Sequence, residues 1–157
     1  MSLMDYIKNK ARADKKTIVL AEGNEPRTVA AAEIVKKEGI ADVILLGDEK
    51  IIRAAGNYDI ADIPIINPAE SEWKEDFAQT YFEMRKNKGM SIEQARETML
   101  NPLYFGAMMV KKDIVDGMVA GAVNSTSNVI LAAVRVIKAA PGIKSVSSCF
   151  IMESPTK

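Results

Sequence analysis

Short runs of aliphatic and β-branched residues alternate along this chain with longer segments of helical periodicity. The runs occupy residues 17–20, 42–46, 64–66 and 117–123, and a further run follows at 145–152. Between them, apolar residues recur every three or four positions, as Ile130, Val134 and Ile137 do in a helix predicted to begin near residue 126. This alternation predicts an α/β fold with a mostly parallel sheet and helices on both faces.

The segment 116–127 says most about function. An apolar run ends there in small residues, and the polar side chains of Asn124, Ser125, Thr126 and Ser127 stand where the next helix must begin. In an open α/β sheet such a turn lies at the carboxyl edge of a strand, where ligands bind. Free backbone N–H groups and the positive end of the helix dipole then favour an anion. The alternative is that one of the hydroxyls simply caps the helix.

Charge and length narrow the functional classes. Lysine plus arginine and aspartate plus glutamate both number 21 in 157 residues, so no net charge points to nucleic acid or to an anionic membrane. No apolar run is long enough to span a bilayer, and no secretory signal sequence is apparent at the amino terminus. A single cysteine, Cys149, fits a reducing compartment. We therefore expect a cytoplasmic protein.

The chain contains no histidine. This removes the commonest general base and the commonest metal ligand. With one cysteine as well, neither a zinc site nor a Cys/His nucleophile pair has its parts, so we expect no metal. Any chemistry that this chain supports must depend on carboxylates, hydroxyls, lysine, arginine and backbone amides.

A series of short motifs runs through the chain in a characteristic order. They are Leu20-Ala21-Glu22-Gly23, Glu25-Pro26-Arg27-Thr28, Ala31-Ala32-Glu33-Ile34, Gly39-Ile40-Ala41, Leu45-Leu46-Gly47, Arg85-Lys86-Asn87-Lys88-Gly89, Tyr104-Phe105-Gly106-Ala107-Met108-Met109-Val110, Asp116-Gly117-Met118-Val119-Ala120-Gly121-Ala122-Val123, Val136-Ile137-Lys138 and Pro141-Gly142-Ile143-Lys144-Ser145-Val146-Ser147-Ser148. Together they resemble the phosphate acetyltransferase (phosphotransacetylase) family. The resemblance spans nearly all of this chain but only the first half of a full-length member.

The resemblance implies a two-domain enzyme similar in architecture to isocitrate and isopropylmalate dehydrogenases. Residues 1–143 would form the first α/β domain, and residues 144–157 would open a truncated second one. Such enzymes transfer an acetyl group reversibly between coenzyme A and phosphate, with acetyl phosphate and coenzyme A as small-molecule substrates, and the family suggests a homodimer. The family's catalytic aspartate, serine and key arginine lie outside this chain, so no catalytic residue is expected here and the fragment should be inactive alone.

Substrate-binding residues are implied at several positions. Arg85 matches an arginine associated with coenzyme A, although it could also complement a helix dipole. Arg27 matches an arginine that could reach the cleft and bind phosphate oxygens, although it could also be a plain exposed residue. The resemblance also favours the anion-site interpretation of residues 124–127 over the plain cap.

The chain departs from the family in the same region. Members usually have histidine at Asn124, aspartate at Asn128 and an Arg-Pro pair at Leu131-Ala132. The arginine lost at Leu131 is also associated with coenzyme A, so binding of that substrate should be weakened or differently arranged. Phosphate butyryltransferase activity is one alternative, and a non-catalytic domain that binds coenzyme A or acyl phosphate for regulation is another. An unrelated nucleotide-binding domain ranks last, because neither a Walker A loop nor a Gly-x-Gly-x-x-Gly turn is present.

Overall fold

The computed structural model describes residues 2–152. Helices and strands alternate through most of this range, as predicted. In chain order they are α1 (Leu3–Ala13), β1 (Thr17–Leu20), α2 (Pro26–Glu38), β2 (Asp42–Leu46), α3 (Glu49–Ala54), β3 (Ile65–Ile66), α4 (Lys74–Arg85), the 3₁₀ helix η1 (Lys86–Lys88), α5 (Ile92–Met99), α6 (Pro102–Lys111), β4 (Gly117–Val119) and α7 (Thr126–Val136).

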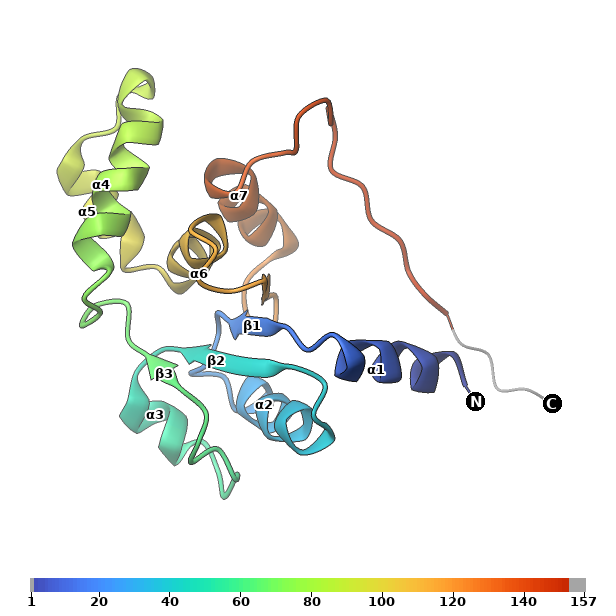
Figure 1. The fold of residues 1–157 in the computed structure, drawn as a ribbon. Coiled ribbons are helices and arrows are strands. Elements are labelled where there is room, and N and C mark those ends of the chain that lie inside the picture. Colours follow the sequence, from blue (N-terminus) through green and yellow to red (C-terminus); the bar gives the residue numbers. More distant parts are fainter. Residues whose placement is uncertain (1, 153–157) are drawn as a thin grey trace.

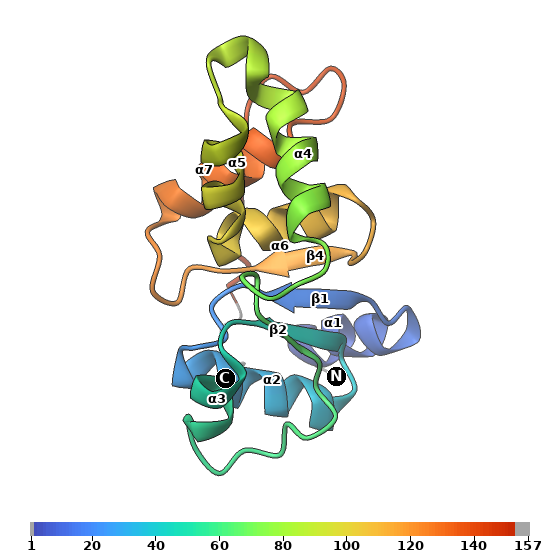
Figure 2. The same ribbon diagram turned by 90° about the vertical axis from the view of Figure 1, so that its left-hand side faces the viewer.

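The strands form one parallel sheet in the order β3-β2-β1-β4. Helices α2 and α3 cover one face, and α4 to α7 lie on the other, so the predicted α/β architecture is confirmed (Figures 1 and 2). The chain runs outward from β1 to β2 and β3 and then returns to place β4 on the other side of β1. The order in which strands are added to the sheet therefore reverses between β1 and β4, while all four strands stay parallel.

Two hydrophobic cores, one on each face, follow from the two-residue repeat of the strands. Val19 and Leu46 point to the face of α4 to α7, where they join large buried side chains such as Phe105. Leu20 and Leu45 point the other way, into a smaller core. That second core also contains Val29 and Ala32 of α2 and Ile52 of α3. The sheet is thus buried on both sides, as parallel sheets usually are.

The structure differs from the sequence-based expectation at both ends. The run 145–152 was expected to be a strand, but it has no regular secondary structure and its residues are exposed. It leaves α7 as an extended segment away from the sheet, so no neighbouring strand supplies the hydrogen bonds that β structure needs (Figure 1). Helix α1 was not anticipated, and none of its side chains is buried.

Along the described part of the chain, we find no helix with the length and apolar character that a transmembrane span requires.

Candidate functional site at the carboxyl edge of the sheet

The loops that follow β1 and β4 meet at the carboxyl edge of the sheet. This is the point where the strand order reverses, the usual position of a ligand crevice in an open α/β fold. A cavity of about 260 Å³ opens there, lined by the β1–α2 loop, Leu46 at the end of β2, Pro102 and Leu103 at the start of α6, and Val123 and Asn124 of the β4–α7 loop. Of the segment 116–127, Val123 and Asn124 line this cavity.

The carboxylate of Glu22, directly after β1, fills a nest of amides in the β4–α7 loop. Oε2 accepts hydrogen bonds from the backbone N–H groups of Gly121 at 2.7 Å and Ala122 at 2.6 Å. Oε1 accepts from the backbone of Val123 at 3.1 Å and Asn124 at 2.8 Å, and from the Asn124 side-chain amide at 2.8 Å. Glu22 is the one buried charged side chain among the described residues. An internal anion therefore occupies the donors of residues 121–124.

These contacts fix the ionisation of Glu22. Burial by itself raises the pKa of the carboxyl, but the hydrogen bonds from the side chain and backbone of Asn124 and from the backbone of Ala122 and Val123 outweigh it and lower the pKa from 4.5 to about 2. Such a shift is typical of a carboxylate that accepts several backbone N–H bonds. Glu22 is thus a fixed negative charge at neutral pH, and it determines the conformation of the loop that leads into α7.

Arg27 lies beside the same loop, in the first turn of α2. Its Nε donates to Glu25 Oε1 at 2.6 Å, and its Nη2 donates to the carbonyl of Ala122 at 2.8 Å. The Arg27 side chain remains 71% exposed, and Nη1 has no partner among the described residues. The structure therefore brings Arg27 and the 121–127 segment together, with part of the guanidinium free to meet a ligand.

Two side chains of the turn after β1 organise the start of α2 and the neighbouring loop. The N-cap is Glu25, whose side chain accepts from the backbone N–H of Arg27. Asn24 Oδ1 instead accepts from the backbone N–H of Asp48 at 2.9 Å, across the turn between β2 and α3. Asn24 therefore ties two neighbouring loops of the cleft together.

The start of α7 keeps donors that nothing in the described structure uses. Ser125 is the N-cap, and its Oγ accepts from the backbone N–H of Asn128 and lies 2.9 Å from Ser127 Oγ. The side chains of Ser125, Thr126 and Ser127 are exposed. The backbone N–H groups of Thr126 and Ser127 have no acceptor among the described residues. Ser125 thus caps the helix, as the simpler alternative proposed, and leaves an open helix N-terminus beside it.

Arg85 lies apart from this cleft, in the last turn of α4. Its Nε is buried and has no hydrogen-bond partner in the described part of the chain. Leu131 is exposed on α7, one turn before Arg135.

Sequence reasoning did not identify Glu22 as a functional position. Its place directly after a buried strand, at the edge where the β4–α7 amides also converge, is the signal that could have identified it. Among the described residues, no group of three or more His, Cys, Asp or Glu side chains is arranged to hold a metal ion.

Comparison with known proteins places these features in context. The model of the phosphate acetyl/butaryl transferase family matches residues 2–157. Phosphate acetyltransferases from Acetivibrio thermocellus and Clostridium acetobutylicum are 51% and 42% identical to the chain; each alignment covers 99% of the chain and 47% of the relative. A crystal structure of a phosphotransacetylase from Streptococcus pyogenes superposes with a TM-score of 0.85 at 34% identity, over 92% of this chain and 46% of that one. The chain thus spans about half the length of the relatives it matches.

Proposed function

This chain belongs to the phosphate acetyl/butaryl transferase family, and on that premise we propose that it forms one wall of an acyltransferase site. The reaction is the reversible transfer of an acetyl group between coenzyme A and phosphate. The observation that carries the proposal is the open N-terminus of α7 at the strand-order reversal, with free amides at Thr126 and Ser127 and three exposed hydroxyls. Such a helix end favours a phosphate or an oxyanion.

The chemistry needs few protein groups. A base removes the thiol proton of coenzyme A, and the thiolate attacks the carbonyl carbon of acetyl phosphate. The C–O bond to phosphate breaks as the C–S bond is made, and inorganic phosphate leaves. Donors that hold the oxyanion and the departing phosphate stabilise the transition state. No thiol-activating base is assigned to this chain; that role belongs to residues outside it.

Within this wall we assign binding roles to the residues of the cleft. The hydroxyls of Ser125, Thr126 and Ser127 and the free amides beside them contact the phosphate of acetyl phosphate. Arg27 is held by the bond from its Nη2 to the Ala122 carbonyl, and its free Nη1 contacts the same phosphate. Asn124 acts indirectly, because its backbone N–H and its side-chain amide both donate to the Glu22 carboxylate. Arg85 contributes to coenzyme A binding at a separate position.

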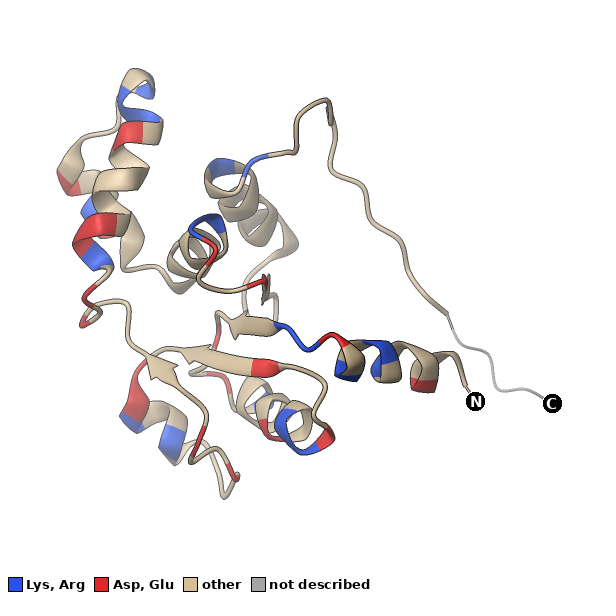
Figure 3. Ribbon diagram, viewed as in Figure 1, with Lys and Arg blue, Asp and Glu red and all other residues tan. Residues whose placement is uncertain are grey.

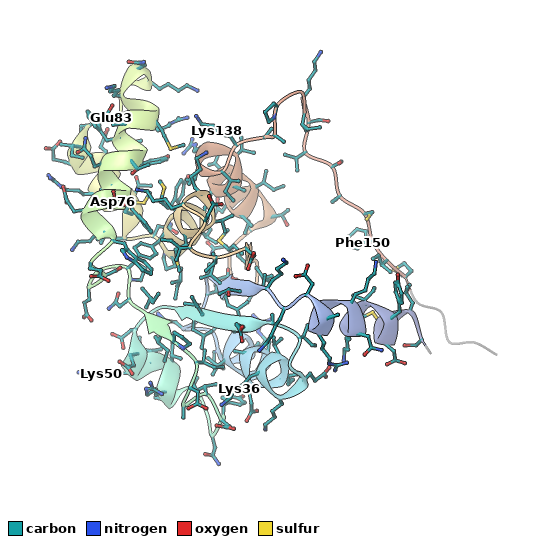
Figure 4. All side chains as sticks on the ribbon, viewed as in Figure 1. Lys36, Lys50, Asp76, Glu83, Lys138 and Phe150 are labelled. Atoms are coloured by element: carbon teal, nitrogen blue, oxygen red, sulfur yellow. The ribbon has the colours of Figure 1, made fainter. Side chains whose placement is uncertain are left out.

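We further propose that a second domain faces this one, in the arrangement of isocitrate and isopropylmalate dehydrogenases, with residues 1–143 as the first domain and 144–157 as the start of the second. Exposed apolar side chains support this division. Ile130 and Val134 on α7 are 42% and 47% exposed, and Phe150 in the extended segment is 93% exposed (Figure 4). Surfaces of this kind mark contact sites. We propose a cytoplasmic homodimer as the working assembly, with no metal required.

The test is an assay of the protein encoded by the full reading frame that contains this chain. We expect it to form acetyl-CoA from acetyl phosphate and coenzyme A, and to reverse the reaction with phosphate or arsenate. A faster rate with butyryl phosphate would assign phosphate butyryltransferase activity instead. A folded protein that binds coenzyme A but turns over neither substrate would support the regulatory alternative and refute the proposal.

A further inference from the structure

The β4–α7 loop, residues 120–124, does not hold its own conformation. Gly121, Ala122 and Val123 are exposed, and Gly121 has a φ of +114°. The backbone N–H groups of residues 121–124 donate to no main-chain carbonyl among the described residues. No charged side chain occurs from Gly117 to Val134, so the loop and most of α7 are uncharged (Figure 3). The loop therefore depends on side chains from other elements.

Two side chains that follow β1 supply these contacts. Glu22 accepts five hydrogen bonds from residues 121–124, at distances of 2.6 to 3.1 Å. Arg27 adds one, from its Nη2 to the carbonyl oxygen of Ala122 at 2.8 Å. Arg27 is exposed, whereas Glu22 is buried, and hydrogen bonds are stronger where water is excluded. Glu22 is thus the main anchor of the loop.

The body of α7 is held independently of this anchor. Ala132 and Val136 are fully buried in the hydrophobic cores. Residues 126–128 of the first turn are exposed, and only Ser125 separates them from Asn124, which donates twice to Glu22. Loss of the Glu22 carboxylate should therefore release the first turn while the rest of the helix stays packed.

We propose that Glu22 is a positioning residue for the acyl transfer described above. By holding residues 121–124, it aims the free N–H groups of Thr126 and Ser127 at the phosphate of acetyl phosphate. Glu22 touches no substrate itself, because the loop's donors occupy both of its oxygens. A displacement of about 1 Å in such donors can lower a rate about 100-fold. The inference rests on the proposed function, which assigns these donors to the phosphate.

The test compares Glu22→Ala and Glu22→Asp in the protein encoded by the full reading frame that contains this chain. Glu22→Ala should lower kcat/KM for acetyl phosphate about tenfold or more, because the donors are no longer aligned. The KM for coenzyme A should stay within about twofold, since this loop is not assigned to that substrate. Glu22→Asp keeps the charge with a shorter reach, so its kcat/KM should fall between the two.

A small carboxylate separates positioning from a general loss of stability. Glu22→Ala leaves the nest of amides at residues 121–124 empty, and such a nest binds anions. Formate carries the same pair of oxygens as the lost side chain. Compared with chloride at equal ionic strength, formate should raise kcat/KM for acetyl phosphate in Glu22→Ala and leave the unchanged protein as it is.

Glu33→Ala is the matched control, because Glu33 also ties a loop to the body of the chain. Its Oε1 accepts from the backbone N–H of Asp59 at 2.8 Å, and it does not line the cleft cavity. This variant should lose stability, keep its kcat/KM for acetyl phosphate and show no response to formate.

The outcomes separate this inference from the proposed function. Turnover by the unchanged protein with an unaltered kcat/KM in folded Glu22→Ala would overturn the inference alone, as would a loss that formate does not reverse. Circular dichroism checks the fold; if Glu22→Ala does not fold, an unaltered kcat/KM in Glu22→Asp overturns the inference instead. No turnover by the unchanged protein would refute the proposed function and this inference with it.

Discussion

At the scale of single residues, Glu22 changes the interpretation of the cleft turn. The sequence suggested that the amides of this turn await an external anion, but those of residues 121–124 already hold an internal one. A nest of consecutive N–H groups binds a carboxylate as readily as a phosphate. The donors left for a substrate therefore begin at Thr126, and Glu22 acts by holding the loop that presents them.

Replacing Glu22 should show how much this contact contributes. In Glu22→Gln, the side-chain NH₂ group faces N–H donors, and the remaining oxygen carries no charge. We expect the free energy of unfolding to fall by about 3 kcal/mol, measured by urea denaturation at pH 7. Glu70→Gln is the control, since Glu70 is exposed and its carboxylate makes no hydrogen bond or ion pair among the described residues. Equal stabilities of the two variants would contradict the role given to Glu22.

The acid dependence of stability should follow from the same carboxylate. Its folded pKa of about 2 lies below the ordinary value of 4.5, so the stabilisation is complete above the unfolded pKa and is lost as pH falls toward the folded one. We expect the difference in unfolding free energy between the unchanged chain and Glu22→Gln to shrink by about 3 kcal/mol between pH 5 and pH 2. A difference that stays constant over that range would show that folding does not lower the pKa of Glu22.

At the scale of helices and strands, local pattern predicted most elements, and long-range contacts determined the rest. The runs 17–20 and 42–46 became β1 and β2 at the expected residues, because two-sided burial leaves a clear apolar signal. The run 117–123 forms a strand only to Val119, since Glu22 pulls the following amides out of the sheet. No local pattern encodes a contact between residues a hundred positions apart. The placement of Arg85 at the end of α4, away from the cleft, was hidden for the same reason.

The first turn of α7 allows capping and ligand binding to be separated. Ser125→Ala removes the cap and should lower the unfolding free energy by about 1 kcal/mol. Ser125→Asp keeps a good cap but places a negative charge where phosphate is proposed to bind, so stability should be retained. In the full-length protein the same variant should raise the KM for acetyl phosphate about tenfold or more. An unchanged KM in Ser125→Asp would remove Ser125 from the binding site and leave it as a cap.

Two glycines test how closely the elements pack. A Cβ at Gly23 would lie 2.6 Å from the backbone carbonyl oxygen of Leu46, which cannot move without disturbing β2. Gly23→Ala should therefore destabilise the chain by about 1–3 kcal/mol in thermal unfolding. A Cβ at Gly106 in α6 would meet the flexible end of Met118 at 2.8 Å. Gly106→Ala should cost less, since the side chain can yield and alanine favours the helix. The reverse order would refute this account of the packing.

At the scale of the whole molecule, the described residues form a sheet that is covered by helices on both faces, but apolar side chains remain exposed elsewhere on the surface. Apolar side chains are exposed on α7, along residues 143–152 and on α1, where Leu3, Met4 and Tyr6 are uncovered. The family assignment agrees with the sequence-based interpretation. The division into two domains rests on the resemblance alone and stays a prediction.

A chimera tests the central claim most directly. Residues 1–157 would be fused to the remaining part of the Acetivibrio thermocellus phosphate acetyltransferase, of which this chain covers 47% at 51% identity. The measurement is the rate of acetyl-CoA formation from acetyl phosphate and coenzyme A, with Ser125→Asp as the variant. We predict turnover by the chimera that falls about tenfold or more in the variant. A folded chimera that binds coenzyme A yet forms no acetyl-CoA would contradict the claim that this chain supplies a working wall of the acyl-transfer site.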